Sequence, residues 1–263
     1  MVERDGRAGT ARPCACRERG ATARLLASAA VPARYRHCKV GNFQVSSGSR
    51  EERAQLLQAR TTAQRYVDEF LQPEGRFRES GLLFIGPPGV GKTHLAAGVL
   101  LELVERYRVR ARFAEFTPLI HQIQATFDPG WPESKQAVLD PLIGAELLVL
   151  DELGAQQPTP WVRDILYLLV NSRYTRRLPT LFTTNYRLEP GAPAKGPASP
   201  PGPTRLDRGR DPEPAPPREE ADLLASRLPA MLVSRLYEMA QPVVLTGVED
   251  FRREHKAHGA HMR

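Results

Sequence analysis

One short loop limits what this chain can fold into more than any other feature of its sequence. The chain runs Gly86-Pro87-Pro88-Gly89-Val90-Gly91-Lys92-Thr93, which matches the phosphate-binding pattern G-x-x-x-x-G-K-[ST] at every fixed position. Apolar residues 82–85 before the loop are typical of a buried parallel strand, and apolar side chains recur at helical spacing after it. The order of strand, glycine-rich loop and helix predicts an α/β nucleotide-binding domain.

The residue types in this loop explain how it would hold a nucleotide. Glycines let the backbone curl around phosphate groups and point its N–H groups inward, and the N-terminus of the following helix adds partial positive charge. We expect Lys92 to reach the β- and γ-phosphates and the Thr93 hydroxyl to bind Mg²⁺. The sequence therefore predicts a site for ATP and Mg²⁺.

Polar residues end the next two predicted strands. Apolar residues 147–150 lead into Asp151 and Glu152, and carboxylates at the C-terminal end of a parallel strand point into the ligand crevice. We expect Asp151 to hold Mg²⁺ through water and Glu152 to polarise the attacking water, which predicts hydrolysis. After a helix over about residues 162–175, a strand ends at Asn185, which either orients the attacking water or simply starts a turn.

A last helix and strand close the predicted domain. Pro229 can open the helix at its first turn, and residues 243–246 have the composition of a strand. Arg235 lies within this helix. It is either a surface cation or a group that reaches the phosphate site of a neighbouring subunit, and spacing alone favours the surface position.

Several strings occur together and in a fixed order. They are residues 86–96, 150–154, 183–185 and 234–239, and residues 32–36 before Asn42 and Phe43 add a further match. In this combination the chain resembles the DnaC/IstB-like ATPases of the AAA+ superfamily, which are bacterial replicative-helicase loaders and ATP-binding helpers of transposases. The resemblance covers roughly residues 30–190 and 220–252.

The resemblance implies a three-layer α/β/α core with a parallel sheet, assembled as a homo-oligomeric ring or helical filament with ATP between subunits. By similarity, residues 86–94 bind the nucleotide, which adds His94 to the loop. Asp151 and Glu152 become the metal and hydrolysis pair, Asn185 the first sensor, and Arg235 an arginine finger that acts on the neighbouring subunit. Arg173 is a weaker candidate for the finger and fits better as a residue that packs or caps a helix end.

The family also implies partners. These are single-stranded DNA along the inner face of the assembly, and either a replicative helicase or a transposase. Residues 113–128, together with Trp131 in the loop that follows, would supply stacking and basic groups to DNA. A core helix built on Phe116, Leu119 and Ile123 accounts for the same segment equally well.

The chain divides into three expected parts. They are a short N-terminal region of residues 1–40, the ATPase domain of residues 41–252 and a polar tail of residues 253–263. Residues 190–217 hold ten of the 24 prolines, which predicts a disordered insertion inside the domain. Long surface insertions cost little stability, so we expect it to leave the site intact.

The cysteines do not make a complete zinc site. Cys14 and Cys16 resemble half of one, but zinc prefers four ligands in two spaced pairs, and Cys38 is the only other cysteine. We therefore expect free thiols here. Many relatives carry a further cysteine pair upstream, so we expect Met1 to be an alternative start of a longer protein.

Composition sets the remaining limits. Lys and Arg total 37 against 30 for Asp and Glu, and the net charge of +7 is compatible with a polyanion partner. No apolar run approaches the roughly 18 residues of a membrane helix, and three cysteines cannot form a disulfide scaffold. These features predict a cytoplasmic protein without a membrane partner.

Four functions follow from this pattern. The leading hypothesis is an ATPase that loads a replicative helicase onto single-stranded DNA in DNA replication, and the second is a transposition helper that delivers a transposase to target DNA. The motifs do not separate these two. A third hypothesis is a nucleotide-dependent binding module without turnover, against which Glu152 argues. A nucleotide kinase is the poorest, because the chain lacks an evident acceptor-binding lid.

Overall fold

The structure is a computed structural model that describes residues 15–45, 48–128, 130–156, 159–188 and 223–245 of the chain, with side chains from residue 19 onward. The expected Pro-rich insertion at residues 190–217, the expected polar tail at residues 253–263, and the side chains of Cys14 and Cys16 lie outside this part. No helix in it is long and apolar enough to cross a membrane.

Five parallel strands form a single sheet in the order β2-β3-β4-β1-β5. The strands are β1 (Gly81–Ile85), β2 (Ala111–Glu115), β3 (Leu147–Asp151), β4 (Thr180–Thr184) and β5 (Ala240–Val244). β1, β3 and β4 are buried along their whole length, as expected for strands covered on both faces. The predicted parallel sheet is therefore confirmed.

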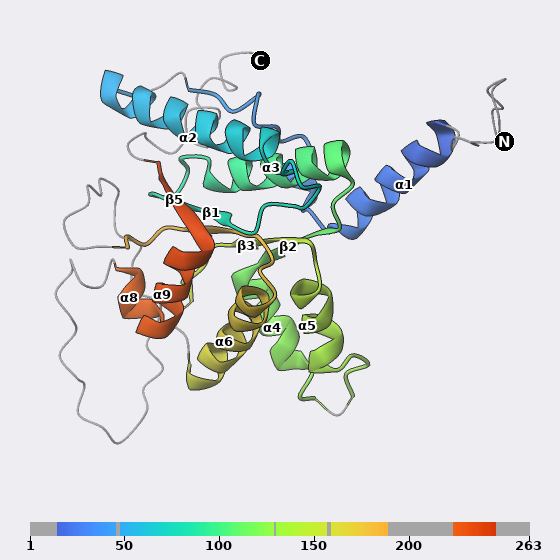
Figure 1. Cartoon of the computed structure of the whole chain (residues 1–263). Helices are drawn as coiled ribbons and strands as arrows, with labels where there is room; N and C mark the ends of the chain where they lie inside the picture. The colour runs from blue at the N-terminus through green and yellow to red at the C-terminus, as the bar shows by residue number, and fades with distance from the viewer. Residues whose placement is uncertain (1–14, 46–47, 129, 157–158, 189–222, 246–263) are drawn as a thin grey trace, which may run out of the picture.

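Helices cover both faces of this sheet (Figure 1). One face carries α1 (Ala15–Ser28), α2 (Arg50–Asp68) and α3 (Lys92–Tyr107), with the 3₁₀ turn η1 (Ala33–Tyr35) between α1 and α2. The other face carries α4 (Phe116–Ala125), α5 (Lys135–Ile143), α6 (Pro160–Thr175), α8 (Leu224–Arg227) and α9 (Ala230–Met239). The three-layer α/β/α arrangement thus agrees with the expectation from sequence.

β5 differs from its predicted span because it begins at Ala240, directly after α9, and not at Val243. Pro242 lies inside the strand, opposite Leu83 of β1. A proline cannot donate a hydrogen bond to the ladder, so it is tolerated mainly in edge strands, and β5 is an edge strand. The apolar pattern alone therefore placed the start of the strand too late.

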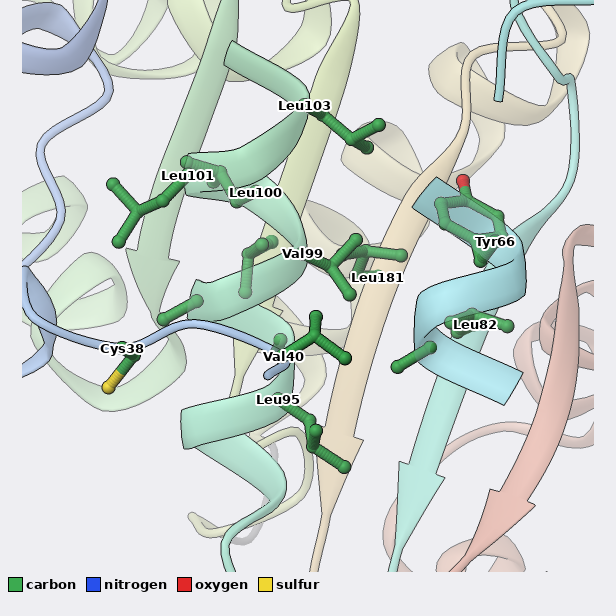
Figure 2. Packing of buried hydrophobic residues seen from close by; sticks show 14 of the residues in the cluster. Cys38, Val40, Tyr66, Leu82, Leu95, Val99, Leu100, Leu101, Leu103 and Leu181 are labelled. Carbon is green, nitrogen blue, oxygen red and sulfur yellow. The ribbon is translucent and has the colours of Figure 1, made fainter. Parts of the chain in front are cut away.

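The helix that follows the phosphate loop is the centre of one core. Leu95 and Val99 of α3 lie toward Leu181 of β4, and Val40 packs beside them from the N-terminal segment (Figure 2). The N-terminal segment approaches closely, because a Cβ atom added to Gly98 would lie 2.9 Å from the backbone nitrogen of Val40.

The N-terminal segment belongs to this core. Ala29, Val31, Cys38 and Val40 are all buried in it, next to α3. Part of the expected N-terminal region of residues 1–40 thus packs in the same core as the sheet and α3. Burying these side chains fixes the segment beside the first turn of α3, where it forms one wall of the site.

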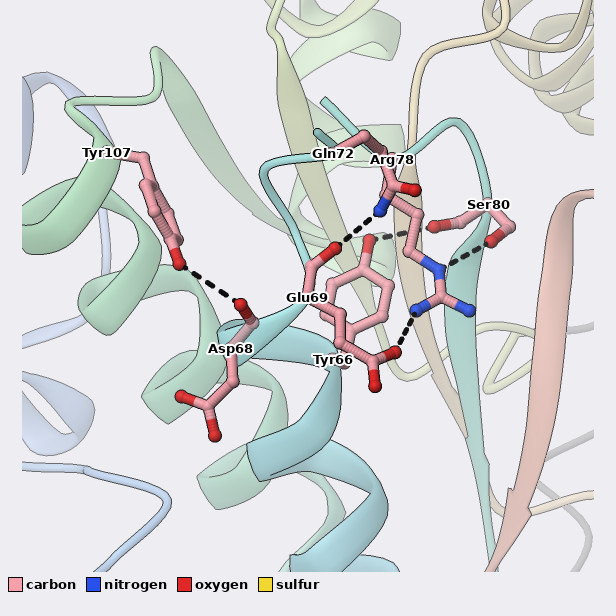
Figure 3. Close-up of polar contacts among 7 residues, drawn as sticks. All are labelled: Tyr66, Asp68, Glu69, Gln72, Arg78, Ser80 and Tyr107. Carbon is pink, nitrogen blue, oxygen red and sulfur yellow. Dashed lines mark hydrogen bonds and ion pairs between the residues drawn. The ribbon is translucent and has the colours of Figure 1, made fainter. Parts of the chain in front are cut away.

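A polar network holds the end of α2 next to the start of β1 (Figure 3). The Tyr66 hydroxyl donates to the backbone carbonyl of Ser80 at 2.9 Å, and Arg78 donates to the Ser80 hydroxyl at 3.1 Å. Arg78 also pairs with Glu69 at 3.4 Å, and the Tyr107 hydroxyl at the end of α3 donates to the carbonyl of Asp68 at 3.4 Å. β1, which leads into the phosphate loop, is thereby tied to two helices.

Arg173 near the end of α6 is fully buried and joins three elements. Its guanidinium donates to the carbonyl of Leu142 (2.7 Å) in the last turn of α5, to that of Ala145 (2.8 Å) just after the helix, and to that of Pro179 (2.7 Å) before β4. The last carbonyls of a helix have no partners within the helix, so the cation completes their hydrogen bonding. This confirms the packing and capping role, and burial keeps Arg173 from reaching a neighbouring subunit.

Candidate nucleotide-binding site

The sheet order brings the predicted site residues together. β1 lies next to β4, and β4 next to β3, so the phosphate loop, Asn185 and Glu152 all follow the carboxyl ends of adjacent strands. A pocket of about 510 Å³ opens there. Among the predicted residues it is lined by Pro88, Gly89, Val90, Gly91, Lys92, Thr93, His94, Glu152 and Asn185.

The loop has a conformation that only glycine adopts easily. Gly89 and Gly91 have φ angles of 85° and 92°, in the left-handed region. Space is also short, because a Cβ atom at Gly91 would lie 2.4 Å from the Phe43 ring, and one at Gly86 would lie 2.0 Å from the carbonyl oxygen of Leu245. The glycines therefore serve both the curl of the loop and its close contact with neighbouring segments.

The side chains that end the loop point into the site. The buried Lys92 ammonium donates to the carbonyl of Pro87 at 2.7 Å, so it lies across the loop. The Thr93 hydroxyl donates to Asp151 Oδ1 at 2.9 Å, which connects the first turn of α3 to the end of β3. Gly91 is the N-cap of α3, so the positive end of that helix also faces the pocket.

Asp151 is fully buried, and only one of its two carboxylate oxygens forms hydrogen bonds within the described part of the chain. Its Oδ1 accepts hydrogen bonds from Thr93 and, at 2.6 Å, from Thr183, whereas its Oδ2 has no partner within the described part of the chain. Burial is the main cause that raises the pKa of this carboxyl. An unsatisfied buried carboxylate oxygen beside a threonine hydroxyl fits Mg²⁺, which binds oxygen ligands and keeps several waters.

Thr183 is a site residue that the sequence reasoning missed. Its hydroxyl donates to Asp151 and accepts the backbone N–H of Glu152 at 2.9 Å, so a single side chain of β4 contacts the last residue of β3 and the residue after it. Glu152 has a φ of 60°, a left-handed turn directly after the strand, and its side chain is exposed to the pocket. The signal available in the sequence was weak, because Thr183 is one of three threonines in the five-residue strand β4.

A second wall of the pocket comes from the N-terminal segment. Arg34, His37, Asn42 and Phe43 line it. Arg34, Asn42 and Phe43 entered the sequence analysis only through the resemblance, and His37 was not predicted to belong to the site. His94 Nε2 lies 2.8 Å from Asn42 Oδ1 and 3.0 Å from the carbonyl oxygen of Lys39, so α3 holds the wall in place. Burial lowers the pKa of His94, which favours the neutral imidazole.

This wall also contains Cys38. The side chain is buried, and burial raises the pKa of its thiol to about 11. No group of three or more His, Cys, Asp or Glu side chains with metal-binding geometry occurs among the residues that the structure describes. Arg34, which lines the pocket, pairs with Glu115 at the end of β2 at 2.8 Å.

Arg235 does not line the pocket of its own chain. It lies on α9, where its guanidinium stacks over the ring of Tyr167 of α6 at 4.7 Å. Within one chain, therefore, the structure brings together every predicted catalytic residue except Arg235.

Comparisons with known proteins agree with this geometry. A family model described as "IstB-like ATP binding protein" matches residues 49–191. The replicative helicase loader DnaC of Escherichia coli is 28% identical over 155 residues, covering 59% of this chain and 58% of that protein. The insertion sequence IS5376 putative ATP-binding protein of Geobacillus stearothermophilus is 30% identical over 122 residues, covering 46% and 47%. The chain thus spans less than two thirds of the length of these relatives.

A solved structure extends the comparison to the fold. The crystal structure of the DnaC helicase loader superimposes with a TM-score of 0.57 at 28% sequence identity, covering 81% of this chain and 99% of that one. The family model covers more than half of the 263 residues, including the phosphate loop and both acidic residues. The chain therefore belongs to the IstB-like ATP-binding proteins, a DnaC-related family of AAA+ ATPases.

Proposed function

We propose that this protein hydrolyses ATP with Mg²⁺ in order to load a replicative helicase onto single-stranded DNA. One observation carries the ATPase part: the phosphate loop and Glu152 line one pocket, and the buried Asp151 is hydrogen-bonded to Thr93 and Thr183 of its lining. The likeness to the DnaC helicase loader supports the loading part.

Each residue has a role that follows from its position. The loop N–H groups and Lys92 bind the phosphates, and Thr93 and Asp151 hold Mg²⁺, which neutralises charge on the transferring phosphoryl group. Glu152, exposed in the pocket, accepts the proton of the attacking water, and Asn185 at the end of β4 orients that water. The N-terminal wall around Asn42 and His94 encloses the remainder of the nucleotide.

The site is completed by a second copy of the chain. Arg235 does not line its own pocket. In related GTPases an arginine supplied by another subunit or protein stabilises charge in the transition state and raises the rate of hydrolysis about 10³–10⁵-fold. A contact of this kind is head-to-tail, and such contacts generate rings or helical filaments. The proposed assembly therefore holds ATP between subunits.

Single-stranded DNA is the proposed polymer that this assembly binds. Phe116, Leu119 and Ile123 of α4 are buried, so this helix belongs to the core as one of the two sequence interpretations expected. Phe127 and Trp131 beyond the helix are exposed, and Phe127 lies 5.4 Å from Trp161, edge to face. Exposed aromatic rings of this kind stack on unpaired bases.

A transposition helper is the second candidate. The family model that matches is named for IstB, and the relative from IS5376 is an ATP-binding protein of an insertion sequence. ATP chemistry would be the same, and only the delivered partner would differ. The two candidates are separated by testing whether this protein, with ATP, retains purified helicase or purified transposase on DNA.

The proposed ATPase is tested by turnover with and without single-stranded DNA. Wild type should be stimulated by DNA, and Glu152→Gln and Arg235→Ala should each lose turnover. An equal mixture of the two variants should regain about a quarter of wild-type turnover, because random assembly pairs the intact Glu152 and Arg235 at that share of interfaces. ATP binding without turnover in the wild type would contradict hydrolysis, and failure of the mixture alone would contradict the shared site.

A further inference from the structure

The surroundings of Arg235 contain more than a helix surface. α6 and α9 pack side by side, and Tyr167 and Tyr174 both lie on the exposed side of α6. The Cζ atom of Arg235 lies 4.7 Å from the centre of the Tyr167 ring and 5.5 Å from that of Tyr174. Arg235 Nη2 also donates to the Tyr167 hydroxyl at 3.3 Å.

The second ring is held by α9 itself. The Tyr174 hydroxyl donates to Glu238 Oε2 at 2.7 Å, and Glu238 follows Arg235 by three positions, so both lie on the same side of the helix. The acid fixes the ring that the arginine contacts. Two exposed tyrosines, an arginine and a glutamate thus form one connected group across the α6–α9 surface, hereafter the tyrosine cradle (Tyr167, Tyr174, Glu238).

We infer that Tyr167 and Tyr174 are positioning residues that present Arg235 to the phosphate site of a second copy of this chain. The inference rests on the proposed role of Arg235 in trans. Stacking uses the flat face of a guanidinium and leaves N–H donors at its edge, which are the groups that bind phosphate. It also removes rotamer freedom before the second copy docks, so less entropy is lost on assembly.

One donor of Arg235 is left without a partner. Its Nη1 is buried and forms no hydrogen bond with any residue in the described ranges. A phosphate oxygen of a second copy docked against the α6–α9 surface would supply the acceptor that this cationic N–H lacks. The cradle therefore orients the arginine without satisfying it.

The inference is tested by placing one substitution on either side of the shared interface. In the mixture of Glu152→Gln and Arg235→Ala subunits, the Glu152→Gln subunit donates the arginine and the Arg235→Ala subunit donates Glu152. Tyr167→Ala added to the arginine donor should lower turnover at saturating ATP about ten-fold, the order expected for a misplaced catalytic group. The same substitution in the Glu152 donor should change turnover little, because that subunit has no arginine to position.

Controls separate positioning from folding. Tyr167→Phe keeps the ring and should retain most of the activity, and Leu168→Ala, at the next exposed position of α6, should behave alike on either side. Melting temperatures of all variants are measured in parallel. Equal loss on both sides, no loss on either side, or faster turnover with Tyr167→Ala in the arginine donor would each overturn the inference. If the parent mixture shows no turnover, the proposed trans role fails first, and the inference fails with it.

Discussion

Replacing Arg173 by methionine should destabilise this protein by about 3 kcal/mol while leaving the chemistry of the site intact. Three buried carbonyls, those of Leu142, Ala145 and Pro179, would lose the donor that now satisfies them. An unsatisfied buried acceptor costs about 1–3 kcal/mol, which gives roughly 3–9 kcal/mol in all. Part of this loss is returned, because burial opposes the charge of Arg173 and lowers its pKa to about 9, and methionine removes that cation.

The assay is thermal unfolding followed by circular dichroism. A loss of about 3 kcal/mol corresponds to a melting temperature lower by roughly 6–12 °C for a chain of this size. Arg163→Met on the same helix is the matched control, since Arg163 is exposed, and a surface change of this kind stays within about 0.5 kcal/mol. Unchanged melting together with lost ATP turnover would refute the reasoning, because it would make Arg173 a catalytic group and not a structural one.

Three further predictions concern the site. Thr183→Val removes the hydroxyl that bonds to Asp151 and to the N–H of Glu152, so turnover should fall about 10–100-fold and require a higher Mg²⁺ concentration. Thr183→Ser keeps the hydroxyl and should retain both the turnover and the Mg²⁺ requirement of the wild type. A magnesium titration of turnover measures both quantities for each variant. Folding raises the pKa of Asp151 above its usual 3.8, so without metal the folded state favours the protonated carboxyl. The stability that this protonated form gives is complete below pH 3.8 and is lost as the pH rises through the pKa of the folded state. Asp151→Asn should therefore melt at a higher temperature than wild type in EDTA at pH 7.5, yet gain nothing from MgATP; a lower melting temperature in EDTA would contradict this. Cys38, buried and with a thiol pKa raised to about 11, should react with iodoacetamide far more slowly at pH 8 in native than in urea-unfolded protein, as followed by peptide mass spectrometry; equal rates would show that the N-terminal wall is open.

Much of the site was predictable because its residues are fixed by chemistry at short range. A phosphate loop needs its glycines, lysine and threonine at fixed spacing along the chain. Buried strands are recognisable as apolar runs that end in polar residues. Those local rules placed the phosphate loop, Asp151 and Asn185 at or directly after the ends of β1, β3 and β4, and the parallel sheet brings these strand ends together. Arg173 does pack and cap a helix end as expected, but the helix that it caps is α5 and not its own helix α6, which its position in the sequence did not indicate.

The N-terminal wall escaped prediction for an equally physical reason. Residues 29–43 have no helical or strand period, and their place is set by contacts far along the chain, such as that between Lys39 and His94. Thr183 was overlooked because a threonine is ordinary in a strand, and only the pairing of β3 with β4 shows that its hydroxyl lies between two acids. Contacts between segments distant in sequence carry no local signature.

The direct passage from α9 into β5 has a mechanical consequence. β5 pairs with β1 in register from Gly81 to Ile85, and the N–H of Leu245 donates to the carbonyl of Ile85 at 2.7 Å, immediately before the phosphate loop. No loop separates α9 from β5, as Figure 1 also shows. In the proposed assembly, the arginine offered to a neighbouring subunit and the strand that leads into the phosphate loop therefore belong to one continuously hydrogen-bonded unit. The distance between successive nucleotides in such an array would be set by the length of this unit.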